Sequence, residues 1–216
     1  MSIRTILFDL DGTLLDTNEL IIQSFQHTYK KHLEKDVPKD EIIKNFGETL
    51  ITTLERDCPY CVEAALSTYR GFQVENFFNY ISIHTGVKDS IKRLYEKGYK
   101  LGIVTSRLYE SAIRGLNHFD LTGYFQCIIG ADSTDKHKPD PTGAFMALEK
   151  LGGTPDETFF VGDSPFDVLC AKNAGMISVV VSWSALPREM YMVHDPDFVV
   201  DSMEELEKLI ERLNNK

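Results

Sequence analysis

The 216-residue sequence contains no hydrophobic run close to the roughly 20 residues that a membrane-spanning helix needs. Its first residues also lack the extended apolar stretch and the small-residue cleavage site of a signal peptide. No internal repeat or low-complexity tract interrupts the chain. We therefore expect a globular cytoplasmic protein that makes no membrane contact.

Positive charge is scarce in this sequence. Lys and Arg together number 23 against 33 Asp and Glu, which gives a formal net charge of −10. An acidic surface argues against non-specific binding of nucleic acid or of anionic lipid. It does not exclude a small anionic substrate, because a local site can reverse the sign of the charge.

Cysteine is also rare, with four residues in the chain. The stretch Cys58-Pro59-Tyr60-Cys61 resembles the glutaredoxin redox motif, which belongs at the start of a helix that follows a strand. No strand pattern precedes it here. A zinc site needs two further ligands, whereas Cys127 and Cys170 stand alone in apolar segments. We expect Cys58 and Cys61 to be reduced thiols packed among helices.

The length of the chain fits one domain with a sizeable insertion. Several short apolar runs lack clean alternation, which is typical of strands buried on both faces. These runs are Thr5–Leu10, Lys100–Thr105, Phe125–Gly130, Thr158–Gly162 and Ile177–Trp183. Helical patterns accompany them at Val87–Lys97, Glu110–Phe119, Asp140–Leu151, Pro165–Ala174 and Met203–Leu213. The alternation predicts an α/β fold with a doubly wound parallel sheet.

The segment Asp16–His84 breaks this rhythm. It contains no convincing strand, and its apolar residues recur at helical spacing. We therefore predict a core domain formed by residues 1–15 and 86–216, with an inserted α-helical domain formed by residues 16–85.

Two carboxylates, Asp9 and Asp11, stand at the end of the first predicted strand. Residues two apart on a strand point to the same face, so the two acids would repel each other. Ligands of open parallel sheets bind beyond the carboxyl ends of the strands. Gly12 frees the backbone to turn there and lets its amide approach an anion.

Other strand ends carry complementary chemistry. Thr105 and Ser106 offer hydroxyls, Lys138 an ammonium, and Asp163 and Asp167 two further carboxylates. A carboxylate can attack phosphorus, and a second acid can protonate the leaving oxygen and later activate water. A hydroxyl and a lysine can hold the phosphoryl oxygens, and Mg²⁺ prefers a few carboxylates together with phosphate. The set indicates phosphoryl transfer.

Four motifs, in the order in which they follow one another along the chain, resemble those of the haloacid dehalogenase-like superfamily. Asp9–Thr13 resembles its first motif, Thr105 its second, Lys138 its third and Gly162–Asp167 its fourth. The resemblance runs over almost the whole chain. It implies a Rossmann-like doubly wound core in which the helical insertion of residues 16–85 is a cap.

The resemblance also implies a role for each motif residue. Asp9 would be the nucleophile and Asp11 the general acid and base, with Thr105 and Lys138 completing the catalytic set. Phosphate would contact Leu10, Gly12, Thr105, Ser106 and Lys138. Magnesium would be held by Asp9, the carbonyl of Asp11 and Asp163, with Asp167 either ligating or supporting them.

Cap residues would then contact the substrate. Gly47, Glu48 and Thr49 fall where related caps send a loop toward the active site, although an ordinary helix–helix turn is an equal interpretation. Arg70 is the other candidate, with a solvated surface arginine as its alternative.

The presence of Asp11 favours a phosphatase or phosphomutase over the dehalogenase branch, which lacks this second acid. Asn18–Ile22, Tyr69–Phe72 and Asn173–Gly175 are similar to the bacterial pyrophosphatase and phosphoglycolate phosphatase subgroup. The resemblance therefore implies a Mg²⁺-dependent phosphohydrolase, monomeric or homodimeric, acting on pyrophosphate, 2-phosphoglycolate or another small phosphorylated metabolite. The alternatives are a phosphomutase of the β-phosphoglucomutase kind and a non-catalytic, receiver-like phosphate-binding module.

Overall fold

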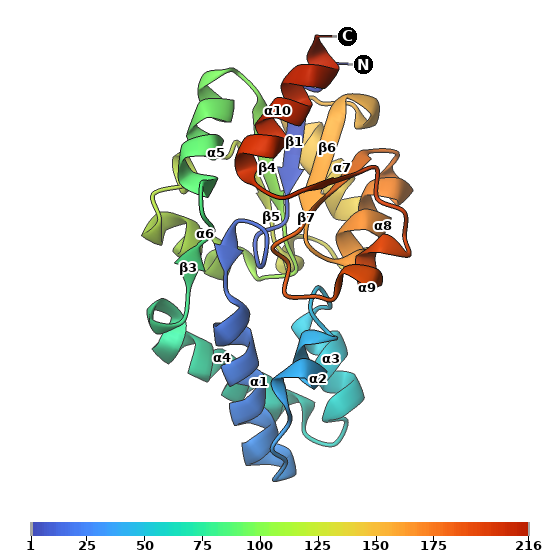
Figure 1. The fold of residues 1–216 in the computed structure, drawn as a ribbon. Coiled ribbons are helices and arrows are strands. Elements are labelled where there is room, and N and C mark those ends of the chain that lie inside the picture. The colour runs from blue at the N-terminus through green and yellow to red at the C-terminus, as the bar shows by residue number, and fades with distance from the viewer. Residues whose placement is uncertain (1, 216) are drawn as a thin grey trace.

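The computed structural model describes residues 2–215 and contains a six-stranded sheet in which every neighbouring pair is parallel (Figure 1). The strand order is β5-β4-β1-β6-β7-β8. The strands are β1 (Thr5–Phe8), β4 (Lys100–Val104), β5 (Cys127–Ile129), β6 (Thr158–Gly162), β7 (Ile177–Val181) and β8 (Phe198–Val200). The predicted doubly wound α/β core is confirmed, and each predicted apolar run contains one strand.

Helices cover both faces of this sheet, as its apolar runs predict. Ile6 and Phe8 of β1 pack with one set of helices, and Leu7 between them packs with the other set. The first set is α5 (Val87–Glu96), α6 (Tyr109–His118) and α10 (Met203–Asn214), and the second is α7 (Thr142–Leu151) and α8 (Pro165–Ala174). Because both faces are covered, most positions of these strands are apolar, although Lys100 and Ser178 are polar exceptions.

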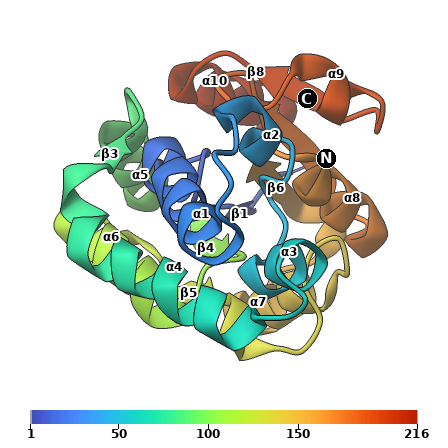
Figure 2. The same cartoon turned by 90° about the horizontal axis from the view of Figure 1, so that it is seen from below.

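A separate group of helices lies below the carboxyl end of the sheet (Figures 1 and 2). It consists of α1 (Asn18–Leu33), α2 (Lys39–Ile43), α3 (Leu50–Asp57) and α4 (Val62–Asn76), and we call it the helical module. Its helices enclose an apolar cluster of their own, in which the rings of Phe25 and Tyr69 lie 4.8 Å apart. The helical character predicted for this segment is confirmed.

The two connections between module and core pair with each other. Leu15–Asp16 (β2) and Ser82–Ile83 (β3) form a two-stranded antiparallel sheet, which the sequence analysis did not predict. The expectation that Asp16–His84 contains no strand is therefore wrong at both ends of the segment. A two-residue strand has no periodicity, and its pairing depends on a partner far along the chain.

Two further elements were absent from the prediction: α9 (Arg188–Met192) and strand β8 at the edge of the sheet. Both are too short to produce a periodic pattern. The chain ends lie side by side (Figure 1), where the amide of Ile3 donates to Oδ1 of Asn214 at 2.6 Å. Within residues 2–215, no helix combines the length and the apolar character that crossing a membrane requires.

Candidate active site

The motif residues meet at the carboxyl ends of the central strands. Asp9 follows β1, Thr105 follows β4 and Asp163 follows β6, and β1 lies between the other two strands in the sheet. The amide of Asp9 continues the ladder by donating to the carbonyl of Val161 at 2.8 Å. Parallel pairing thus brings three segments that are distant in sequence to one edge of the sheet.

Lys138 reaches this edge from the loop before α7. Its Nζ lies 2.9 Å from Oδ1 of Asp9 and 2.6 Å from Oδ1 of Asp167. The side chain of Lys138 is only 4% exposed. Burial acts to lower the pKa of this ammonium, but the two carboxylates outweigh burial and raise it. Lys138 is therefore a fixed positive charge beside Asp9.

Asp167 is occupied by donors on both of its carboxylate oxygens. Oδ1 accepts from Lys138, and Oδ2 accepts from the Ser164 amide at 3.0 Å, the Ser164 hydroxyl at 2.6 Å and the Asp163 amide at 3.2 Å. The residue lies in the first turn of α8, where a carboxylate stabilises the free amides of the helix. Of the two roles that the sequence left open for Asp167, this arrangement favours support of the site over direct ligation.

Three buried carboxylates provide a candidate metal centre. Asp9, Asp163 and Asp167 each offer an oxygen within 4.8 Å of the other two. Burial and neighbouring carboxylates raise the pKa of Asp9 to about 7, against the opposing effect of Lys138. Burial likewise raises the pKa of Asp163 well above its usual range.

These observations test whether a divalent cation fits. One ammonium faces three carboxylates, so the cluster has an excess of negative charge. Oδ1 of Asp9 is buried and lies 2.9 Å from Nζ of Lys138, and no other donor within residues 2–215 reaches it. Carboxylate oxygens are the donors that Mg²⁺ prefers. The residues present therefore fit such an ion, with Asp9 and Asp163 as the available carboxylates.

The carboxylate of Asp11 lies outside this cluster, and the predicted metal contact of Asp11, through its backbone carbonyl, stays a prediction. Its carboxylate accepts from the Arg107 guanidinium, with the shortest distance 2.8 Å, and from Oγ1 of Thr17 at 2.6 Å. Burial acts to raise the pKa of Asp11, but Arg107 and Thr17 outweigh burial and lower it. The sequence did not predict the contact between Asp11 and Arg107, which stands two residues after Thr105.

The two hydroxyl residues after β4 lie where the sequence predicts. Thr105 is buried, and its Oγ1 accepts from the amide of Arg107 at 3.1 Å. Ser106 donates from Oγ to the carbonyl of Gly47 at 3.1 Å, which links the core to the helical module. Both residues face the main cavity.

The first motif differs from expectation at one backbone group. The amide of Gly12 donates to the carbonyl of Leu15 at 2.8 Å and closes the turn after Asp11. The prediction that this amide faces an anion is therefore wrong for this conformation. Glycine is needed for a steric reason, because φ is +77° and a Cβ would lie 2.4 Å from Oδ2 of Asp163. The Leu10 side chain is buried in the core.

A cavity of about 540 Å³ separates the helical module from the sheet edge. All four predicted cap residues, Gly47, Glu48, Thr49 and Arg70, line it together with Asp9 and Asp11. The fold therefore brings residues of the helical insertion to the predicted catalytic aspartates.

The loop around Gly47, between α2 and α3, approaches the core closely. A Cβ on Gly47 would lie 2.7 Å from the Phe166 ring and 2.8 Å from Oγ of Ser164, and φ is +94°. Only glycine allows this contact without displacement. The loop therefore touches the segment that carries Asp163 and Asp167.

The basic residues that line the cavity differ in the ion pairs and aromatic contacts that they form. Arg107 is bound to Asp11, and Arg114 lies over the rings of Phe77 and Phe78 at 4.8 and 4.6 Å. Glu48 is paired with Arg56 at 2.9 Å. Arg70 is exposed and forms no ion pair with any residue from 2 to 215. Its guanidinium is therefore free to meet an anion in the cavity.

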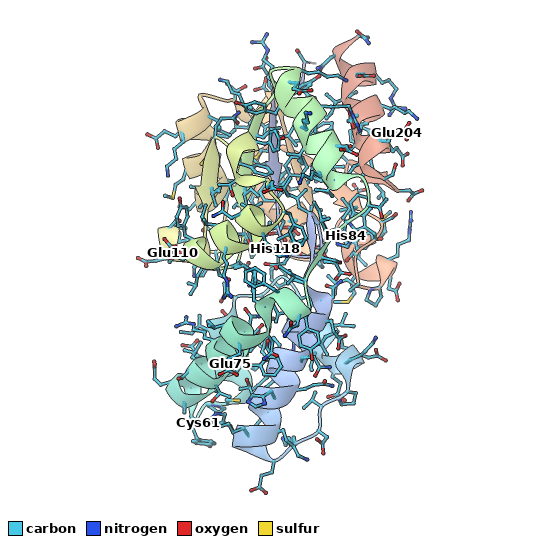
Figure 3. All side chains as sticks on the ribbon, turned by 90° about the vertical axis from the view of Figure 1, so that its left-hand side faces the viewer. Cys61, Glu75, His84, Glu110, His118 and Glu204 are labelled. Carbon is cyan, nitrogen blue, oxygen red and sulfur yellow. The ribbon has the colours of Figure 1, made fainter. Side chains whose placement is uncertain are left out.

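The cysteine pair lies away from this site. Figure 3 shows Cys61 at the far end of the helical module, and Cys58 is buried in the module's apolar cluster. Both are free thiols, and burial raises the pKa of Cys58 to about 11. These positions agree with the packing role that the sequence predicts.

Comparison with known proteins agrees with the family resemblance of the four sequence motifs. The family model described as Haloacid dehalogenase-like hydrolase matches residues 6–181. A relative named "Putative pyrophosphatase PpaX" from Caldanaerobacter subterraneus is 44% identical over 210 residues, which cover 97% of this chain and 96% of the relative. One named Pyrophosphatase PpaX from Anoxybacillus flavithermus is 37% identical over 206 residues, 95% of this chain and 96% of that protein.

Solved structures share the fold. A crystal structure of a predicted phosphoglycolate phosphatase from Haemophilus somnus superposes with a TM-score of 0.85 at 21% sequence identity, covering 97% of this chain and 98% of that one. At this level of identity, the likeness concerns the arrangement of helices and strands.

Proposed function

The chain belongs to the haloacid dehalogenase-like hydrolase family, and from this premise we propose that it is a Mg²⁺-dependent phosphatase with an aspartyl-phosphate intermediate on Asp9. One observation carries the proposal: the buried carboxylate of Asp9 lies 2.9 Å from Lys138, within a carboxylate cluster, on the wall of a large cavity. We also propose that residues 16–85 act as a cap that excludes water from this cavity when it closes.

In the first step, an Asp9 carboxylate oxygen attacks the substrate phosphorus. The new oxygen–phosphorus bond forms as the bond to the leaving oxygen breaks. Asp11 gives a proton to that oxygen, and it must take this proton up before the step, because Arg107 and Thr17 lower its pKa and hold it as a carboxylate in this conformation. Lys138 and the Thr105 hydroxyl hold the phosphoryl oxygens, whose charge is spread in the transition state. The buried position of Lys138 makes its charge more effective than it would be in water.

In the second step, water attacks the phosphorus of the acyl phosphate. Asp11, now a carboxylate, takes a proton from this water, and the bond between Asp9 and phosphorus breaks. Inorganic phosphate leaves, and both aspartates return to their starting forms.

Asp9, Asp163 and the backbone carbonyl of Asp11 are the groups that would hold Mg²⁺, while Asp167 supports them through the Ser164 turn. When bound, the ion offsets phosphoryl charge and orients the substrate.

For the substrate, we propose inorganic pyrophosphate first and 2-phosphoglycolate second. The names of the relatives that match the whole chain support pyrophosphate. The free guanidinium of Arg70 in the cavity supports either molecule, because each carries a second anionic group beyond the reacting phosphoryl. The motif resemblance to the phosphoglycolate phosphatase subgroup supports the second choice.

The first experiment is phosphate release with Mg²⁺ from pyrophosphate, 2-phosphoglycolate, sugar phosphates and p-nitrophenyl phosphate, with Asp9→Asn as the inactive control. We expect the highest kcat/KM for pyrophosphate and no release by D9N. Conversion of one sugar phosphate isomer into another would favour the phosphomutase instead. Folded wild-type protein that releases no phosphate from any compound would contradict the proposal.

A second pair of variants tests the role of Arg70. We expect Arg70→Met to lower kcat/KM for pyrophosphate about tenfold or more, and to leave p-nitrophenyl phosphate almost unaffected, because that substrate has no second anion. Arg212→Met on α10 is the matched control, since it removes the same charge far from the cavity. Equal losses on both substrates would reject Arg70 as the residue that binds the second charge.

A further inference from the structure

The carboxylate of Asp11 is held by a single buried arginine. Nε of Arg107 donates to Oδ1 at 3.1 Å and to Oδ2 at 3.0 Å, and a terminal nitrogen donates to Oδ1 at 2.8 Å. The side chain of Arg107 is 7% exposed and that of Asp11 is 20% exposed. A planar guanidinium in this two-point contact fixes the orientation of a carboxylate as well as its charge.

The same guanidinium also contacts the helical module. Its other terminal nitrogen donates to Oε1 of Gln73 on α4 at 3.1 Å and to Oγ of Ser111 on α6 at 3.0 Å. Gln73 belongs to the module and Ser111 to the core. Arg107 thus connects Asp11 to both sides of the cavity.

Asp11 has a second connection to the module. Thr17, which donates to Oδ1 of Asp11, immediately precedes α1. The carboxylate is therefore tied to the beginning of the module by Thr17 and to its last helix by Arg107 through Gln73. A displacement of the module relative to the sheet must change at least one of these contacts.

We propose that Arg107 is a positioning residue that sets the orientation of Asp11 according to the position of the helical module, through its hydrogen bond to Gln73. The inference rests on the proposed role of Asp11 as general acid and base. Its consequence is that Asp11 takes its working orientation only when the module is correctly placed over the substrate, since an error of about 1 Å at a reacting group costs about 10²-fold in rate.

Donor counting separates this role from substrate binding. An arginine has five N–H groups, one on Nε and two on each terminal nitrogen. Contacts to Asp11, Gln73 and Ser111 use the Nε group, both groups on one terminal nitrogen and one on the other. One N–H group remains, so Arg107 cannot clamp a phosphoryl group while these contacts last.

The test compares Arg107→Met, Arg107→Lys, Gln73→Leu and the R107M/Q73L double variant on p-nitrophenyl phosphate with Mg²⁺. We expect R107M to lower kcat about 100-fold while KM changes less than about threefold. R107K should recover only part of the loss, because an ammonium cannot make the two-point contact. Gln23→Leu, which removes a half-buried glutamine on α1 whose side-chain amide donates to Glu19, is the control and should behave as wild type.

The double variant tests the link to the module. We expect Q73L to lower kcat about fivefold in the wild-type background and to have no effect in the R107M background, because its contact is then already lost. Independent, multiplicative effects would show that Gln73 does not act through Arg107. A rise of KM with unchanged kcat in R107M would overturn the inference in favour of direct substrate binding.

Crystal structures of the wild type, R107K and Q73L give a readout that needs no activity. We expect the Asp11 carboxylate to lose its single orientation in both variants, and R107K serves if R107M does not fold. An unchanged Asp11 in both would overturn the inference even if the enzyme is active. If the wild type releases no phosphate, the proposed function is rejected. The crystal structures would then still decide whether Arg107 orients the Asp11 carboxylate.

Discussion

Nζ of Lys138 lies 2.9 Å from Oδ1 of Asp9, and both side chains are almost completely buried. The lysine comes from the loop before α7 and the aspartate from the end of β1, so this contact joins two distant parts of the chain. It places a permanent positive charge beside the proposed nucleophile. The same charge is positioned to stabilise the phosphoryl oxygens during transfer.

Replacement of Lys138 by methionine should reduce both activity and stability. We expect kcat/KM to fall by at least about 100-fold, because one charged donor to the transferred group is lost. We expect the free energy of unfolding to fall by about 3 kcal/mol, because Asp9 and Asp167 lose their buried partner. Urea unfolding and steady-state kinetics measure the two effects. Lys172→Met is the control, because its contact with Asp195 is exposed and should contribute less than about 0.5 kcal/mol.

Metal binding should depend on Asp163 more than on any exposed acid. We expect Asp163→Asn to raise the Mg²⁺ concentration needed for half-maximal activity at least about tenfold, because a buried carboxylate ligand is lost. Calorimetric titration with Mg²⁺ measures the same change without substrate. Asp195→Asn removes a fully exposed carboxylate and should leave the affinity unchanged. Equal affinities in wild type and D163N would argue against the proposed metal centre.

Gly47 should be essential for the contact between the helical module and the core. We expect Gly47→Ala to raise KM about tenfold, because a Cβ would collide with Phe166 and Ser164 and displace the loop from the cavity. Gly71→Ala is a close control, since nothing lies within 4 Å of its Cβ position and it stands within α4. That variant should keep its KM and gain up to about 1 kcal/mol of stability from the higher helix propensity of alanine. Similar KM values for G47A and wild type would exclude a role for the loop contact.

Because His84 lies at the junction between module and core, we expect the stability of the protein to depend on pH. Figure 3 shows this residue where the two parts meet, and its buried Nε2 has no hydrogen-bond partner within residues 2–215. Burial lowers the pKa of His84 below 6.5, against the opposing effect of Asp16. The folded state therefore binds this proton less readily than the unfolded state. The neutral form of His84 makes its full contribution to the free energy of unfolding above pH 6.5. This contribution is lost as the pH falls through 6.5 toward the lower pKa that His84 has in the folded state.

Urea unfolding of the wild type and of His84→Gln between pH 5 and 8 measures this effect. We expect the wild type to lose stability relative to H84Q as the pH falls below about 6.5. Parallel stability curves would show that His84 does not titrate differently in the two states.

Much of the core was predictable because its signals are local. Buried parallel strands are apolar at most positions, and helices between them end at glycines such as Gly98 and Gly152, which both adopt positive φ. The two-residue strands β2 and β3 were not predictable, since neither has a pattern and each exists only because the other lies opposite. Strand β8 was missed because acids flank its three residues, whereas the equally short β5 lies within the longer apolar run Phe125–Gly130.

The sequence alone determined which chemical groups the protein has and at which strand ends they stand. Asp9, Thr105 and Asp163 were identifiable because parallel strands direct their carboxyl ends to one edge of a sheet, and Lys138, in the loop before α7, was identifiable from the motif that it resembles. Only the tertiary structure decided how these groups are used. It pairs Asp11 with Arg107, engages both oxygens of Asp167 and turns the Gly12 amide toward Leu15. Such pairings depend on distances between segments far apart in the chain, and no local pattern of residues encodes them.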